Sequence, residues 1–370
     1  MNPASNVLSP GEQVIFRLRE LYRRYGYKPY KMSQFEPYDL YAENKRFLVS
    51  ENVITFNGLD GTLLALKPDV TLSIVKNFKE TDARCKVYYN ENVYRADAEG
   101  QAYREIMQTG LEYLGDVDLY ATSEVCSLAM RSLQAISDDF LLALSHMGFL
   151  TGVLDAAGLS DAGRADALTC LSEKNLPGMR AVCERENVPA HAASALTELT
   201  ALYAPFGEAL PRLRTLSVSD ATDAALDELS ALFALLRQSV ALEKLRIDFS
   251  IVNDMNYYSG LIFQGFLEGV PCAILSGGRY DPLLAKFGKT GGAIGFAVYT
   301  NLLEQWHPQD DEYDADVLLL YDDDTDLARL GAQVQALTDQ GQQVLAARCA
   351  DGVRCRRTIR FGKEGATDVE

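Results

Sequence analysis

Hydrophobic residues recur at helical spacing in the first part of the chain and at alternating positions in the part that follows. Residues 8–26 open with Ser9, Pro10 and Glu12, a pattern typical of a helix start, and apolar residues then follow every three or four positions. Short alternating runs between residues 27 and 71, with Asn57-Gly58 and Asp60-Gly61 between them, predict antiparallel strands joined by tight turns. A helix is predicted next, over residues 71–79, and two further strands follow it, over residues 86–95 and 104–115.

The pattern changes near residue 119. From about 119 to 240, long amphipathic stretches rich in alanine and leucine predict a mostly helical region, and we interpret about 150–240 as an insertion. Strand-like runs return at 244–252, 257–267 and 270–278, and a helix is predicted from Asp281 to Phe287. After residue 314 the pattern is strand, helix, strand, strand, which predicts a small α/β unit. We therefore expect an α+β protein with an antiparallel sheet flanked by helices over 1–310 and a short unit over 311–370.

The composition describes an ordinary globular protein and weighs against nucleic-acid binding. The chain has 370 residues, of which 48% are hydrophobic and 24% charged, and no apolar run is long enough to cross a membrane. The sequence therefore predicts a cytoplasmic protein. The formal net charge of -17 disfavours a tRNA partner, because nucleic-acid binding depends on lysine and arginine side chains that neutralise phosphates.

Cysteine usage predicts neither a metal site nor a disulfide framework. The seven cysteines are scattered, with no CxxC pair and no histidine at zinc-ligand spacing. We expect small buried thiols in a reducing compartment, and no bound metal or cofactor.

Several stretches place charged or aromatic residues in otherwise apolar strands. Asp69 and Thr71 lie where a strand ends and a helix begins, and Arg95 ends the next strand. Gln108 and Glu112 point to the same face of a later strand, with Gly110 between them, because side chains alternate along a strand. This pattern places an amide and a carboxylate on one face of the strand, with nothing bulky between them.

Tyrosines and a glycine pair complete the candidate site. Tyr257 and Tyr258 begin one strand-like run, Gly277 and Gly278 end another, and Tyr280 follows shortly after. Carboxylates suit the ammonium group of an amino acid, an arginine suits its carboxylate, and tyrosines suit the walls, so we expect a pocket for a zwitterion.

Each signal also has an ordinary structural interpretation. Arg95 alone is typical of a surface ion pair, Tyr257-Tyr258 of strand packing, and Glu112 of a solvated strand end. The pair Gly277-Gly278 lacks the spacing of known phosphate-binding loops. The order in which the signals occur favours a common site.

That order resembles the catalytic core of histidyl-tRNA synthetases over about residues 8–305. Residues 92–115 resemble the class II motif 2 hairpin in its histidyl form, and residues 64–71 (LALKPDVT) resemble the family's LRPExT segment. Residues 255–266 and 276–288 resemble LDYYTGxxFE and GGRYDGL. The resemblance implies a class II synthetase-like core and places at histidine- or adenylate-contacting positions Asp69, Thr71, Arg95, Gln108, Glu112, Tyr257, Tyr258 and Tyr280.

Departures from the family pattern fall where an amino acid would be activated. Asn253 stands at an arginine position, and GFAVYTNLL places Asn301 and Leu302 where GFAxGLER has its glutamate and its ATP-binding arginine. The motif 2 acid is shortened to Asp97, and the motif 1 proline is replaced by Ser33. Losing a preorganised cation costs about 10²–10³ in rate, so the pattern predicts that adenylation is lost.

The pattern is similar to that of one branch of this family, the regulatory subunits of ATP phosphoribosyltransferase. The resemblance implies a non-catalytic subunit that binds the short-form catalytic subunit, senses histidine as the effector, self-associates as a dimer, and carries a reduced anticodon-binding-like unit over 311–370. Two alternatives remain open: a divergent synthetase-like enzyme that activates an amino acid, and a paralogue that binds another protein in stress signalling.

A basic cluster lies near the C-terminal end of the sequence, at Arg354, Arg356, Arg357, Arg360 and Lys363. We expect a solvated edge strand protected by charge, and an RNA contact remains the alternative.

Overall fold

The chain divides into two compact units, Met1–His307 and Pro308–Glu370, in a computed structural model. The structure describes residues 8–48, 52–79, 84–96, 102–238, 240–251, 257–306, 313–362 and 365–369. No helix in these ranges is both long and apolar enough to cross a membrane.

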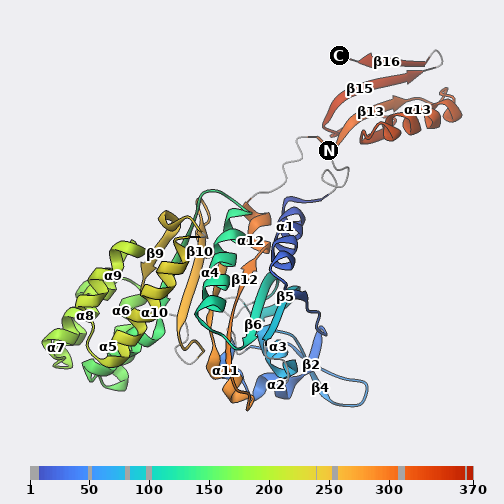
Figure 1. Cartoon of the computed structure of the whole chain (residues 1–370). Helices are drawn as coiled ribbons and strands as arrows, with labels where there is room; N and C mark the ends of the chain where they lie inside the picture. Colours follow the sequence, from blue (N-terminus) through green and yellow to red (C-terminus); the bar gives the residue numbers. More distant parts are fainter. Residues whose placement is uncertain are drawn as a thin grey trace. The chain divides into compact units, whose positions relative to one another are not determined.

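The first unit is built on one large sheet (Figure 1). Among the described residues it has nine strands in the order β1-β5-β6-β12-β11-β10-β7-β9-β8. Its strands are β1 (Lys28–Pro29), β5 (Arg84–Ala96), β6 (Tyr103–Gly115), β7 (Phe140–His146), β8 (Tyr203–Pro205), β9 (Leu245–Asp248), β10 (Leu261–Leu267), β11 (Leu275–Arg279) and β12 (Gly292–Tyr299). The central strands from β5 to β7 are antiparallel, as predicted, but β1 pairs with β5 and β7 with β9 in parallel.

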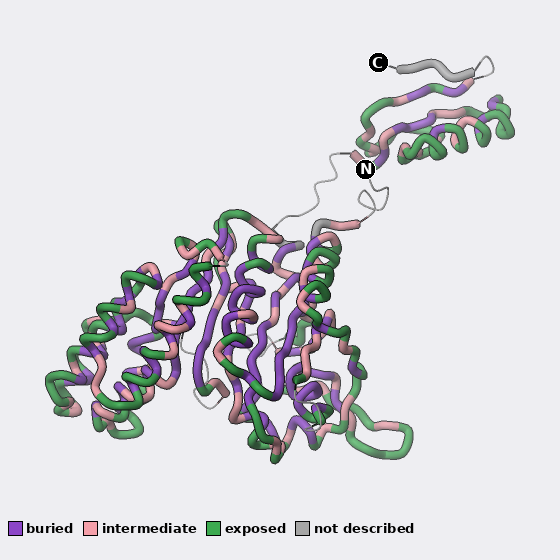
Figure 2. The backbone as a smooth tube through the Cα atoms, in the orientation of Figure 1, coloured by how far each residue is buried: buried purple, intermediate pink, exposed green. Residues whose placement is uncertain are grey.

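Helices pack on both faces of this sheet. Helices α1 (Pro10–Arg24) and α4 (Leu119–Gln134) join one apolar core with β6 residues such as Leu111. The opposite face packs against α2 (Tyr38–Ala42), α3 (Thr71–Asn77), α11 (Asp281–Lys286) and a three-stranded sheet of β2 (Phe35–Pro37), β4 (Leu63–Leu66) and β3 (Thr55–Asn57). Since both faces are covered, strands β12, β11, β10 and β7 are buried over most of their length (Figure 2).

The start of α1 follows directly from the sequence. The Ser9 side chain accepts a hydrogen bond from the backbone of Glu12, and the Glu12 carboxylate accepts one from the backbone of Ser9. This reciprocal cap satisfies two backbone donors that a helix start otherwise leaves unpaired. The helix prediction for residues 8–26 is confirmed, with Pro10 as the first helical residue.

The region predicted to be mostly helical contains two strands of the main sheet, β7 and the short edge strand β8. The expectation of helices from 119 to 240 is wrong for β7, which lies between β10 and β9. Its sequence FLLALSH is a short continuous apolar run, which periodicity alone cannot distinguish from a buried helix segment. The helices that follow it are α5 (Met147–Ala157), α6 (Asp161–Ser172), α7 (Leu176–Arg185), α8 (Ala190–Ala201), α9 (Phe206–Thr215) and α10 (Asp220–Leu236). They form the long crossover that a parallel β7–β9 pair requires.

The second unit is a small sheet with one described helix. Among the described residues its strand order is β14-β13-β15-β16, from β13 (Ala315–Tyr321), β14 (Val344–Ala347), β15 (Cys355–Gly362) and β16 (Gly365–Val369), with α13 (Leu327–Asp339) packed on one face. The prediction of a basic edge strand is wrong, because β15 lies between β13 and β16. Arg354 and Arg356 instead pair with Asp314 and Asp316, the neighbouring acids before and in β13.

Candidate functional site

A cavity of about 500 Å³ opens on the α3 face of the main sheet. This volume is typical of a small-molecule site. All eight side chains singled out in the sequence line it: Asp69, Thr71, Arg95, Gln108, Glu112, Tyr257, Tyr258 and Tyr280. Residues from separate parts of the chain are thus brought together in one pocket.

The floor of the pocket consists of small residues on neighbouring strands. Strands β6, β12 and β11 align Glu112 with Gly295, and Gly295 with Gly278. A Cβ atom at Gly295 would overlap the Glu112 carboxylate, and one at Gly278 would lie 2.7 Å from the Tyr258 ring. Because these two glycines have no side chains, the Glu112 carboxylate and the Tyr258 ring can lie directly over them.

Glu112 is a buried carboxylate held by two hydroxyl groups. Its side chain is 2% exposed, and it accepts hydrogen bonds from Thr71 Oγ1 at 2.9 Å and from Tyr280 Oη at 2.6 Å. Burial raises the pKa of Glu112 to about 8, although the two hydroxyl groups oppose this shift; the nearby Asp69 carboxylate adds to it. A cationic group on a ligand would favour the ionised form of Glu112.

Asp69 and Arg95 form an ion pair in the pocket wall. Asp69 Oδ1 accepts a hydrogen bond from the backbone of Leu72 at 2.8 Å, at the start of α3, and Asp69 Oδ2 lies 3.7 Å from the Arg95 guanidinium. Arg95 Nε donates to the carbonyl of Pro68 at 2.7 Å. Burial raises the pKa of Asp69, against the opposing charge of Arg95. Since Arg95 is 7% exposed, its interpretation as a surface ion pair is wrong.

Three tyrosines form an aromatic wall. The Tyr257 ring lies with its centroid 4.6 Å from that of Tyr258 and 5.7 Å from that of Tyr280. Phe47, from the segment after α2, meets the Tyr257 ring edge-on at 6.1 Å. Tyr257 and Tyr258 lie before β10 begins, so they line the cavity and do not belong to the ladder of that strand.

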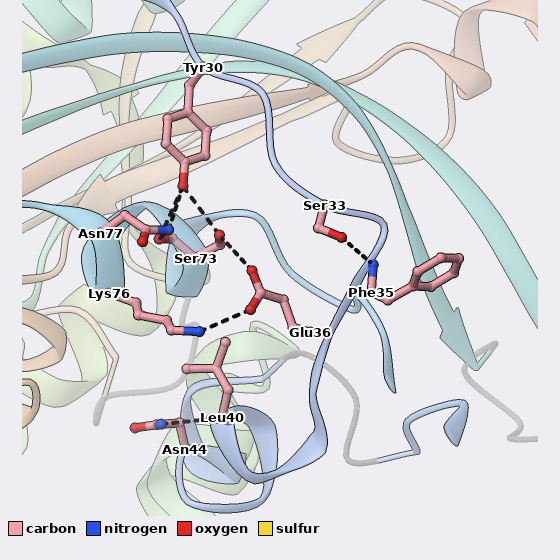
Figure 3. Close-up of polar contacts among 9 residues, drawn as sticks. All are labelled: Tyr30, Ser33, Phe35, Glu36, Leu40, Asn44, Ser73, Lys76 and Asn77. Atoms are coloured by element: carbon pink, nitrogen blue, oxygen red, sulfur yellow. Dashed lines mark hydrogen bonds and ion pairs between the residues drawn. The ribbon is translucent and has the colours of Figure 1, made fainter. Parts of the chain in front are cut away.

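A polar network anchors the helix that carries Thr71 (Figure 3). Glu36 of β2 accepts hydrogen bonds from Lys76 Nζ at 3.0 Å and from Ser73 Oγ at 3.4 Å, and the Tyr30 hydroxyl donates to the Ser73 carbonyl at 3.2 Å. Ser33, at the proline position of motif 1, accepts a hydrogen bond from the backbone of Phe35. The residue that departs from the family pattern thus stabilises the bend before β2.

The departures from the synthetase pattern are placed only in part. Asn301 begins α12 (Asn301–Trp306), and neither Asn301 nor Leu302 lines the cavity. Asn253 and Asp97 lie outside the described residues. Among the described side chains that line the cavity, Arg95 is the one cation.

Tyr89, Gln264 and Tyr299 are among the lining residues that were missed in the sequence. Gln264 stands where the LDYYTGxxFE pattern has a glutamate, and Tyr299 stands where GFAxGLER has its second glycine. Both could have been found by comparing these motifs letter by letter. Tyr89 carried no such signal, because it lies in β5 before residue 92, where the resemblance to motif 2 begins.

Acidic and thiol groups are dispersed elsewhere in the molecule. No group of three or more histidine, cysteine, aspartate or glutamate side chains within the described ranges could hold a metal ion. The seven cysteines are free. The expectation that they are buried is wrong for Cys272 and Cys349, which are exposed, and Cys85 and Cys355 are only partly buried.

Comparisons with known proteins place the chain in a family. The family model described as histidyl-tRNA synthetase matches residues 9–303. ATP phosphoribosyltransferase regulatory subunits from Anaeromyxobacter sp. and Lactococcus lactis are 32% and 30% identical to the chain, over 76% of this chain and 84% and 88% of theirs. A solved Bacillus halodurans structure, described as an ATP phosphoribosyltransferase regulatory subunit/histidyl-tRNA synthetase, has a TM-score of 0.77 at 26% identity and covers 95% of this chain and 93% of its own. The chain therefore belongs to the histidyl-tRNA synthetase family, in the branch of the ATP phosphoribosyltransferase regulatory subunits.

Proposed function

We propose that this chain is the non-catalytic regulatory subunit of a cytoplasmic ATP phosphoribosyltransferase, and that its pocket senses histidine. In this role it binds the short-form catalytic subunit, self-associates as a dimer, and transmits histidine feedback to the first step of histidine biosynthesis. The names of its relatives support the assembly, and the pocket supports the sensing.

The buried Glu112 and Asp69 carboxylates are the observation that carries the sensing proposal. Two buried carboxylates with raised pKa values are poorly stabilised as anions, so a cationic ammonium or imidazolium group that enters the pocket is strongly favoured. Arg95 lies in the same wall and suits a ligand carboxylate. Tyr257 and Tyr258 supply flat walls for an imidazole ring.

Binding alone is sufficient for this function, so the residues that activate an amino acid are not needed. Arg95 is the one cation among the described lining residues, and Leu302 occupies the place of the ATP-binding arginine. A site without that cation gives up the electrostatic stabilisation that adenylation requires. Feedback needs only that histidine binds the inhibited state of the assembly more tightly than the active state.

The first experiment tests the partner. The purified chain is mixed with a short-form catalytic subunit, and phosphoribosyl transfer to ATP is measured with and without histidine. We expect stimulation by the chain and inhibition by histidine. If the chain has no effect on activity at any ratio of the two subunits, the proposed assembly is wrong.

The second experiment tests the pocket. Glu112→Ala should weaken histidine binding by about 10- to 100-fold, the range for losing a charged hydrogen bond, while the complex still assembles. Glu268→Ala is the matched control, because Glu268 is exposed just beyond β10 and does not line the cavity. Equal histidine affinity of the two variants in calorimetry would contradict the role of Glu112.

Pyrophosphate exchange with histidine and ATP tests the alternative that the chain is an amino-acid-activating enzyme. Because the motif 3 arginine is replaced, we expect no exchange above background. Robust exchange would support an amino-acid-activating enzyme instead.

A further inference from the structure

The small-residue floor of the pocket ends abruptly at Tyr299. On β12 the side chains that face the cavity come from alternate positions, Gly295, Ala297 and Tyr299. The first two leave the floor open, and the third adds a large ring at the last residue of the strand.

Strand pairing measures the length of this floor. Gly295 pairs with Glu112 and Tyr299 pairs with Gln108, so the two ends are four residues apart on each strand. At about 3.4 Å per residue the floor is about 14 Å long. A ligand with its cationic group at Glu112 therefore has a limited length before it meets Tyr299.

Tyr299 shares the cavity with the other tyrosines of the pocket. Burial raises the pKa of both Tyr89 and Tyr258, and the Tyr299 hydroxyl contributes to both shifts. Tyr299 lines the same cavity as these two tyrosines, and the strand register places it at the end of the floor. It forms an end wall.

The family pattern has no side chain at this place. GFAxGLER puts a glycine where this chain has Tyr299, and a glycine would continue the row of small residues formed by Gly295 and Ala297. The end wall is therefore a feature of this chain and not of the pattern that it otherwise follows.

We propose that Tyr299 sets the length of ligand that the pocket accepts, so that a free amino acid binds and an amino acid joined to a nucleotide is excluded. This inference rests on the proposed function, since it presumes an amino acid with its ammonium group near Glu112. The aminoacyl group of an adenylate would occupy the floor, and the nucleotide of the adenylate would then overlap the Tyr299 ring. Exclusion of the adenylate then has a steric cause, in addition to the missing arginine.

The test compares two ligands by calorimetry on the full-length chain. The probes are L-histidine and a non-hydrolysable sulfamoyl analogue of histidyl-adenylate. Tyr299→Gly should shift the ratio of the two dissociation constants toward the analogue by about 10- to 200-fold, the range for steric discrimination in a pocket. Tyr299→Phe keeps the ring and removes the hydroxyl, so its ratio should stay close to that of the unmodified chain.

The outcomes separate this inference from the proposed function. An unmodified chain that binds the analogue more tightly than histidine overturns the inference, as does an unchanged ratio in both Tyr299→Gly and Tyr299→Ala. Tyr299→Ala serves as the second variant if the glycine lowers the melting temperature. If the unmodified chain binds no histidine but the Tyr299→Gly variant binds the analogue, the role of Tyr299 as an end wall is supported and histidine sensing is rejected.

Discussion

Charged residues are buried in the pocket but exposed to solvent in the C-terminal unit. Glu112 is 2% exposed and its pKa is raised to about 8, whereas the Arg356–Asp316 pair joins side chains that are 68% and 35% exposed. A surface pair is solvated and contributes little, but a buried carboxylate has unfavourable solvation that a ligand can relieve. Burial of the charge, more than its presence, marks the functional region.

Glycines differ between the two regions in the same way. Gly295 lies under the Glu112 carboxylate with no room for another atom, whereas Gly331 in α13 has no atom within 4 Å of an added Cβ. The first is required by packing and the second is not. Substitutions in each region can therefore test whether the pocket is a specialised part of the fold.

The largest expected effect is the pH dependence that Glu112 gives to stability. Its pKa is raised from 4.5 to about 8 in the folded chain, so the folded state binds the proton more tightly than the unfolded state does. This contribution is complete below about pH 4.5 and is lost as the pH rises to about 8, by at most about 1.4 kcal/mol per pH unit. Urea unfolding of the unliganded chain between pH 5 and 9 measures it.

Glu112→Gln is the reference for that experiment, because a glutamine cannot titrate. The difference in free energy of unfolding between the unmodified chain and the variant should fall with pH and become level above about pH 8. A difference that stays constant or rises over this range contradicts the raised pKa.

Gly295→Ala should come next in size. The added methyl group overlaps the Glu112 carboxylate and the Leu111 carbonyl, and such overpacking destabilises a fold by about 1–3 kcal/mol. Hydrogen exchange of the β6 and β12 amides reports this loss locally. Unchanged protection in these strands would show that the floor can adjust, and that the pocket is less rigid than the strand register implies.

Gly331→Ala should have a smaller effect of the opposite sign. Gly331 is exposed inside α13, where alanine favours the helix by about 0.5–1 kcal/mol. Protection of the α13 amides should therefore increase. A decrease would mean that this helix is constrained by a contact, as the pocket floor is.

Arg356→Ala should have the smallest effect. The exposed pair with Asp316 is expected to contribute less than about 1 kcal/mol, and less still at high salt. Unfolding measured at low and high ionic strength tests this. A loss as large as that of Gly295→Ala would remove the distinction drawn between surface and buried charges.

Much of the pocket could be predicted from local sequence because strand alternation fixes which side chains share a face. Gln108 and Glu112 were expected on one face of one strand, and both line the cavity. Strand β7 could not be predicted in the same way, since its continuous apolar run has no period that separates a strand from a helix. The edge position expected for β15 was wrong because the following strand covers it.

The sequence by itself determined the local structure: the cap of α1, the alternation along β6 and β12, and the residue types of a zwitterion pocket. Only the tertiary structure decided that β6, β12, β11 and β10 lie side by side, with Gly295 under Glu112 and Tyr299 at the end of the floor. Long-range strand register and exclusion of water arise from packing among distant segments. The raised pKa of Glu112 depends on that packing, so no local pattern could have predicted it.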